Sequence, residues 1–196
     1  MAAGATGRAS WIYRVAWIFY LILALGGALW VGARQGRIAP GLFFDAATWW
    51  IDLVIGSAAG ALLVLLWVGA RRALPTAREL EIQLAEALGP LAPGEILGLA
   101  LLSGFAEELF FRGAVQGAWG WIPATALFAL LHAGPGPSYR VWTGFAAVAG
   151  LALAGLMIWR GNLLAPVVTH VLVNGVNLHR LTAHTGERQR APRANE

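Results

Sequence analysis

Long apolar runs with almost no charge are the feature that most constrains the fold of this chain. The first two runs cover residues 11–31 and 49–70, and each is followed by arginines. Crossing a bilayer takes roughly 20 mostly apolar residues as a helix. Further apolar segments follow at residues 96–119, 121–131, 141–159 and 163–181. We therefore predict an all-α membrane helical bundle that is polytopic, with about six transmembrane segments.

Two parts of the chain do not fit a simple span. Residues 75–89 are more polar, with leucines at helical spacing and Thr76 three residues before Glu79, the spacing of a capping box. We expect a short amphipathic helix on the membrane surface there. The segment 121–131 is too short to cross alone, so it either starts deeper in the bundle or is completed by the Gly/Pro stretch after it.

The boundaries divide the chain into three parts. Residues 1–94 are expected to hold two N-terminal transmembrane helices and the surface helix. Residues 95–182 form the polar-containing core of the bundle. Residues 183–196 are polar, and we expect a disordered tail there.

Composition excludes several classes of protein. Apolar residues make up 58% of the chain and charged residues 12%, and the chain contains 0 Cys. A disulfide framework, a cysteine nucleophile and a zinc-finger ligand set are therefore excluded. The net charge of +4 comes from arginines scattered between apolar runs, which disfavours nucleic-acid binding. Their uneven distribution over the loops predicts an inner (plasma) membrane protein with both termini in the cytoplasm.

Polar groups inside apolar spans are the best candidates for function, because each is costly in lipid unless it is paired or hydrated. The third apolar segment carries adjacent glutamates and an arginine, the fourth ends in a histidine, and the sixth carries a histidine and an asparagine on one helix face. These candidate site residues are Glu107, Glu108, Arg112, His132, His170 and Asn174.

Spacing separates the roles of the two glutamates. Glu108 and Arg112 stand at i, i+4 with the acid first, the favoured order for an intrahelical ion pair. Glu107 points about 100° away and needs another partner. The candidates at membrane depth are His132, His170 and Asn174. A carboxylate that meets imidazoles and an amide in a space shielded from lipid can hold and activate water, with or without a metal ion.

Structural interpretations compete with the functional ones. Asn177 is better explained as a hydrogen bond between helices, and the Glu108–Arg112 pair could equally serve packing. Asp45, Asp52 and Arg14 lie at predicted span ends, where hydration suffices, and we assign them no role. Adjacent glutamates together with two histidines on three segments favour function.

The polar residues also match three motifs of a known family. Glu-Glu-x-x-x-Arg corresponds to Glu107, Glu108 and Arg112, Phe-x-x-x-His to Phe128 and His132, and His-x-x-x-Asn to His170 and Asn174. Each motif alone is weak, but all three occur in order on separate apolar segments. The chain thus resembles the CPBP family of intramembrane metalloproteases, also called the CAAX-protease, bacteriocin-processing or Abi family, which is related to the Rce1-type prenyl proteases.

The resemblance implies that residues 95–182 are the core of an intramembrane endopeptidase that acts near the C-terminus of a membrane-bound protein or peptide. By the same resemblance, Glu107 would be the general base, His132 would hold the water, and His170 and Asn174 would stabilise the oxyanion or coordinate a metal. Glu108 and Arg112 would be supporting residues. Small family members also include sorting proteases for C-terminal membrane anchors, the myxosortases.

Two questions stay open at the level of sequence. His132 and His170 could be ligands of a catalytic zinc, but the HExxH spacing is absent and a metal-free mechanism remains an alternative. A non-catalytic membrane immunity or scaffold protein would keep the fold without needing Glu107. A small carrier is disfavoured because the chain shows no inverted repeat.

Overall fold

The computed structural model describes the backbone of residues 2–190 and the side chains of residues 11–183. Within these residues the fold is all-α, as predicted. The longest apolar helices are α1 (Ala2–Gln35), α2 (Trp49–Ala73) and α7 (Pro137–Arg160). These three are long and apolar enough to cross a membrane. A fourth span results if Pro75–Leu88 and Pro93–Trp119, which meet at a bend of 110°, are counted as one broken span.

The remaining helices are shorter or more polar. They comprise the 3-10 turn η1 (Pro40–Leu42), α3 (Pro75–Leu88), α4 (Pro93–Glu108), the π-helical segment η2 (Leu109–Gln116), α5 (Gly117–Trp119), α6 (Trp121–Leu131) and α8 (Leu164–Arg190). The predicted segments thus all occur as helices, with α4, η2 and α5 forming one continuous rod. Six complete crossings stay a prediction.

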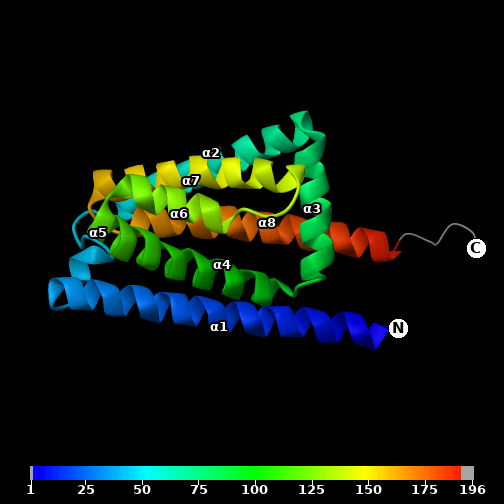
Figure 1. Ribbon diagram of the computed structural model, residues 1–196, viewed down its shortest axis with the longest axis horizontal. Coiled ribbons are helices and arrows are strands. Elements are labelled where there is room, and N and C mark those ends of the chain that lie inside the picture. The colour runs from blue at the N-terminus through cyan, green and yellow to red at the C-terminus, as the bar shows by residue number, and fades with distance from the viewer. Residues whose placement is uncertain (1, 191–196) are drawn as a thin grey trace, which may run out of the picture.

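The long helices lie nearly side by side, and α3 crosses them at one end (Figure 1). Helix α1 packs along α4 and η2, while α2 packs most extensively on α8. The start of α1 and the end of α8 lie at the same end of the bundle, next to α3 (Figure 1). This placement agrees with both termini being on one side of the membrane, and which side that is stays a prediction.

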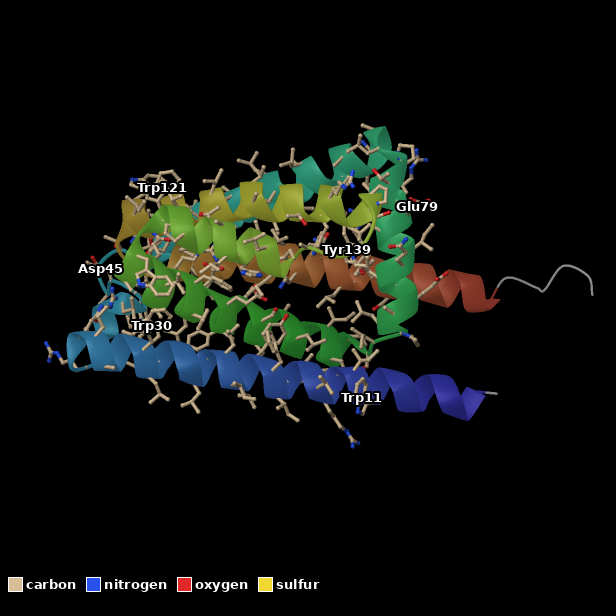
Figure 2. The ribbon with its side chains drawn as sticks, viewed as in Figure 1. Trp11, Trp30, Asp45, Glu79, Trp121 and Tyr139 are labelled. Carbon is tan, nitrogen blue, oxygen red and sulfur yellow. The ribbon has the colours of Figure 1, made fainter. Side chains whose placement is uncertain are left out.

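The outer surface suits a lipid environment. Side chains such as Ile22 and Leu62 are 65% and 67% exposed although they are apolar. Trp11 lies towards the α3 end of the bundle, and Trp30 and Trp121 lie near the other end (Figure 2). Tryptophans at both ends of an apolar surface are typical of membrane interfaces.

Small residues let α8 approach its neighbours closely. A Cβ atom added at Gly56 of α2 would lie 2.6 Å from the carbonyl oxygen of Ala165, and one at Gly104 of α4 would lie 2.6 Å from Cγ2 of Val171. The Thr169 hydroxyl donates a hydrogen bond to the Gly56 carbonyl at 2.9 Å. Helix α8 is therefore held at fixed distances from both α2 and α4.

Two local predictions were wrong. Helix α3 exists as expected, but Pro75 occupies its first position and Leu74 is the N-cap, so Thr76 makes no cap. A proline at the first helical position needs no amide partner, which moves the helix start ahead of Thr76. Helix α8 runs to Arg190, so residues 183–190 of the predicted disordered tail are helical, because propagation of an existing helix needs no new nucleus. Residues 191–196 lie outside the described residues.

Asp52 was also misjudged, because the structure buries it completely instead of leaving it at a hydrated span end. It forms an ion pair with Arg160 and accepts a hydrogen bond from the Asn162 amide at 3.0 Å. The Asn162 side chain in turn accepts a hydrogen bond from the Leu164 backbone amide at 2.9 Å. This network joins the start of α2, the end of α7 and the start of α8 at the end of the bundle opposite α3.

Candidate active site

The two adjacent glutamates lie where α4 passes into the π-helical segment. Glu107 and Glu108 are the last residues of α4, and both are buried, with Glu108 0% exposed. The following residues, Leu109–Gln116, form η2. Single π-helical turns inside α-helices occur frequently at functional sites, because they change the direction of the side chains that follow.

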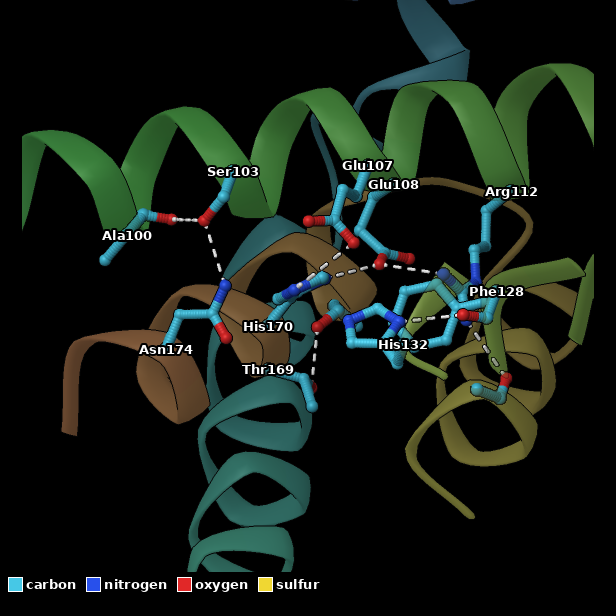
Figure 3. Close-up of polar contacts among 12 residues, drawn as sticks. Ala100, Ser103, Glu107, Glu108, Arg112, Phe128, His132, Thr169, His170 and Asn174 are labelled. Carbon is cyan, nitrogen blue, oxygen red and sulfur yellow. Dashed lines mark hydrogen bonds and ion pairs between the residues drawn. The ribbon is translucent and has the colours of Figure 1, made fainter. Parts of the chain in front are cut away.

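Glu108 connects three elements of the bundle. Its Oε1 atom accepts a hydrogen bond from Arg112 at 3.0 Å, which confirms the predicted i, i+4 ion pair. The same oxygen is 2.7 Å from Nδ1 of His170 on α8 (Figure 3). Arg112 also donates to the Gly150 carbonyl of α7 at 3.1 Å, and its guanidinium lies 4.5 Å from the centre of the Phe128 ring. Both charges are thus buried but paired.

The contact with Glu108 fixes the orientation of His170. A carboxylate oxygen can only accept, so Nδ1 of His170 carries the hydrogen. The other ring nitrogen, Nε2, then faces Glu107, whose Oε2 atom is 4.0 Å away. His170 was one of three candidate partners of Glu107, and it contacts both glutamates, with the shorter contact to Glu108. The reason is that Glu108 projects towards α8 as well as towards Arg112.

His132 lies directly after α6 and is oriented by the backbone of that helix. Its Nδ1 atom is 2.7 Å from the carbonyl oxygen of Phe128. Since a carbonyl only accepts, Nδ1 is the donor, and Nε2 of the neutral ring is left as an acceptor. The ring packs against Phe128 and Trp142, with ring centroids 4.7 and 5.7 Å away.

Asn174 stands one helical turn after His170 on α8. Its side-chain amide donates a hydrogen bond to the Ser103 hydroxyl of α4 at 2.9 Å. Asn174 was one of three candidate partners of Glu107, and its side-chain hydrogen bond goes to Ser103, one turn before Glu107 on α4, while both residues line the same cavity. One N–H of the Asn174 amide is used in this bond, and the amide carries a second.

A cavity of about 240 Å³ connects these residues to the α3 end of the bundle. Glu107, Ser103, His132 and Asn174 line its inner part. Its remaining walls come from α1, α3, α4, α7 and α8, at Ala16, Tyr20, Leu84, Leu88, Leu99, Trp142, Asn177, Leu178 and Leu181. The Tyr20 hydroxyl interacts with the Glu107 carboxylate. Glu107 therefore faces a space large enough for several water molecules.

The structure brings all six predicted site residues to one region, where α4, η2, α6 and α8 meet (Figure 3). Glu107, His132 and Asn174 line the 240 Å³ cavity, and Glu108, Arg112 and His170 form the buried network beside it. The sequence analysis missed Ser103 and Tyr20. Ser103 could have been found, since it lies four residues before Glu107 on the same helix face. No pattern in the sequence pairs Tyr20 with Glu107.

A metal ion fits this arrangement poorly. Among the described residues, no three His, Asp or Glu side chains come together as ligands for a metal. A zinc site needs three protein ligands at about 2 Å from the ion, and the hydrogen bonds of Nδ1 in both His132 and His170 leave only Nε2 of each ring as a ligand atom. Zinc therefore stays a prediction, and the chemistry below is derived from the side chains alone.

Residues 90–176 match the sequence model of a family described as type II CAAX prenyl endopeptidase Rce1-like. All six site residues lie in this region. The Bacillus subtilis (strain 168) protein YpbD, described as an uncharacterized protein, is 38% identical to this chain over 86 residues, which cover 41% of this chain and 42% of YpbD. The aligned part thus spans less than half of that relative. No solved structure matches the chain.

By its motifs and this match, the region that carries the site, a little under half of the chain, is similar to the core of CAAX-protease (CPBP) family members.

Proposed function

We propose that this chain is an intramembrane endopeptidase that hydrolyses a peptide bond near the C-terminus of a membrane-bound protein or peptide. The observation that carries the proposal is the position of Glu107. It is a buried carboxylate that has no intrahelical cation of its own and faces a 240 Å³ cavity shared with His132 and Asn174. Glu108 is compensated by Arg112 on its own helix, whereas Glu107 lies beside Tyr20 and, at 4.0 Å, Nε2 of His170, and its carboxylate lines the cavity.

The arrangement supports attack by a water molecule held between Glu107 and His132. Nε2 of His132 can accept one hydrogen bond from this water while Glu107 takes its proton. The resulting hydroxide forms a bond to the carbonyl carbon of the substrate, and the carbonyl oxygen becomes an oxyanion. The free N–H of Asn174 and a protonated His170 are the available donors to that oxygen. Glu107 then returns its proton to the leaving amine as the C–N bond breaks.

Glu108 and Arg112 act in this mechanism as positioning residues. Glu108 binds Nδ1 of His170 and so directs Nε2 into the site. Arg112 compensates the charge of Glu108 and ties η2 to α7. A neutral carboxylate–guanidinium pair leaves Glu107 as the negative group available for proton transfer.

The position of the cavity suggests the class of substrate. It runs from the site to the α3 end of the bundle, where α3 contributes Leu84 and Leu88. A substrate anchored in the bilayer can place a flexible terminal segment there more easily than a folded domain. Removal of C-terminal membrane anchors, as in the myxosortases, is one activity of this type, and zinc assistance is a further variant that metal removal tests.

A comparison of membrane peptides tests the proposal. Cells that produce the wild-type protein and cells that produce Glu107→Gln at the same level are compared by mass spectrometry of membrane-protein C-termini. We expect shortened C-termini only with the wild type. Identical C-termini in both strains, at equal protein levels, would favour a non-catalytic immunity or scaffold protein.

A further inference from the structure

A second, smaller cavity lies beside the proposed catalytic centre. Its volume is about 40 Å³, and His170 lines it without lining the larger cavity. His132, Trp142 and Asn174 line both cavities. The two spaces therefore meet at the residues that would hold the water and the substrate carbonyl.

The walls of the small cavity are apolar. Away from the shared residues they come from α2, α6, α7 and α8, at Leu63, Phe128, Phe145, Ala146, Leu153 and Val173. Each of these side chains is 9% exposed or less. Besides His170, whose Nδ1 is bound to Glu108, the cavity has Thr169 as a polar wall residue, and its hydroxyl already donates its hydrogen to the backbone. A group that enters this space from the site thus leaves water and gains only apolar contacts.

We propose that this cavity is the binding pocket for the side chain of the residue whose carbonyl is attacked, and that it accepts small aliphatic side chains. This inference rests on the proposed function and adds its specificity. A carbonyl held by Asn174 and His170 at the junction of the cavities places its own side chain next to the small cavity, because both residues line it. The larger cavity, which contains Glu107, is left for the water and the rest of the substrate.

The volume sets the size of the accepted side chain. By the same kind of measure, a water molecule needs about 10–15 Å³, and a cavity of about 150 Å³ holds a benzene ring. A space of 40 Å³ therefore suits one to three carbon atoms, the side chains of Ala to Val. An aromatic ring does not fit unless the walls move. One methylene more or less in an apolar pocket changes selectivity by about 10- to 200-fold.

The test uses the purified full-length protein in lipid nanodiscs with a synthetic library of single-span peptides. One residue in the juxtamembrane segment is varied, and the products are identified by mass spectrometry. The wild type is expected to cleave after Ala or Val at least about 10-fold faster than after Phe. Equal rates after Ala and Phe would overturn the pocket assignment.

Two variants change the pocket in opposite directions. Leu63→Ala enlarges it and is expected to raise cleavage after Leu or Phe about 10-fold relative to Ala. Leu62→Ala is the matched control, because it removes the same atoms from a side chain that is 67% exposed on the outer surface of α2. Ala146→Leu fills the pocket and is expected to shift cleavage towards Gly.

The outcomes separate the pocket from the activity. Thermal unfolding shows whether Leu63→Ala and Ala146→Leu are folded. If the wild type cleaves and both folded variants keep its residue preference, the pocket assignment is wrong and the protease function stands. If the wild type cleaves no library peptide faster than Glu107→Gln, the protease function fails and the pocket falls with it.

Discussion

The close approach of α4 and α8 at Gly104 predicts a large effect of a single methyl group. In Gly104→Ala the new Cβ atom would lie 2.6 Å from Cγ2 and 3.1 Å from the backbone nitrogen of Val171. Carbon atoms in contact are normally about 3.5–4.0 Å apart. Helices α4 and α8 must therefore separate by about 1 Å, since the backbone of Val171 cannot turn away as a side chain can.

Moving α8 away from α4 displaces His170, a residue of the site. His170 is adjacent to Val171, and its Nδ1 is 2.7 Å from Glu108 Oε1. A shift of about 1 Å lengthens this contact to roughly 3.7 Å, beyond a hydrogen bond. Overpacking costs about 1–3 kcal/mol, offset by about 1 kcal/mol of better helix propensity. We therefore expect a small loss of stability but a fall in cleavage rate of about 100-fold.

Peptide cleavage and thermal unfolding, measured on the same nanodisc samples, check this prediction. Gly155→Ala is the control, because nothing lies within 4 Å of the added Cβ atom. Gly104→Ala combined with Val171→Ala removes the 2.6 Å contact and should recover part of the activity. Wild-type cleavage by Gly104→Ala would refute the claim that the spacing of α4 and α8 sets the geometry of His170.

Three further outcomes are expected. Glu108→Gln leaves the buried Arg112 without its charge partner and should lower the free energy of unfolding, measured by denaturation in detergent, by about 3–5 kcal/mol. The double variant Glu108→Gln with Arg112→Gln should regain part of this loss. An unchanged denaturation midpoint for Glu108→Gln would argue against the ion pair. Asp52→Ala should lower the free energy of unfolding by about 1–3 kcal/mol in the same measurement, because Arg160 and Asn162 lose their acceptor. Asp45→Ala, at an exposed position, is the control. Equal denaturation midpoints for the two variants would contradict the network. Chelator treatment of the purified protein should leave cleavage unchanged if side chains alone activate the water, whereas loss on chelation and recovery on zinc addition would require a metal.

Local patterns in the sequence predicted most of the helices and one contact of the site. Apolar runs determine which segments become helices in lipid, so each predicted segment was found as a helix. The Glu108–Arg112 pair could be predicted because both residues lie one turn apart on one helix. Contacts of this range depend on backbone geometry that the sequence specifies directly.

Contacts between helices were harder to predict from the sequence. The sequence left His132, His170 and Asn174 open as partners of Glu107. In the structure His170 is 4.0 Å from Glu107 and hydrogen-bonds to Glu108, since the rotation of α8 depends on its packing against Gly56 and Gly104. The burial of Asp52 could have been inferred, because its span begins on the side of the membrane where the span carrying Arg160 ends. The π-helical turn in η2 has no sequence signature of its own.

The cleavage rate of Glu107→Gln tests the central claim most directly. The substitution keeps the shape of the side chain but removes its ability to accept a proton, so cleavage of the library peptides by purified protein should fall by about 10²- to 10⁴-fold at an unchanged unfolding temperature. Glu95→Gln, at the first turn of the same helix, is the matched control and should cleave like the wild type. Cleavage by Glu107→Gln at the wild-type rate would contradict the account and exclude Glu107 as the general base.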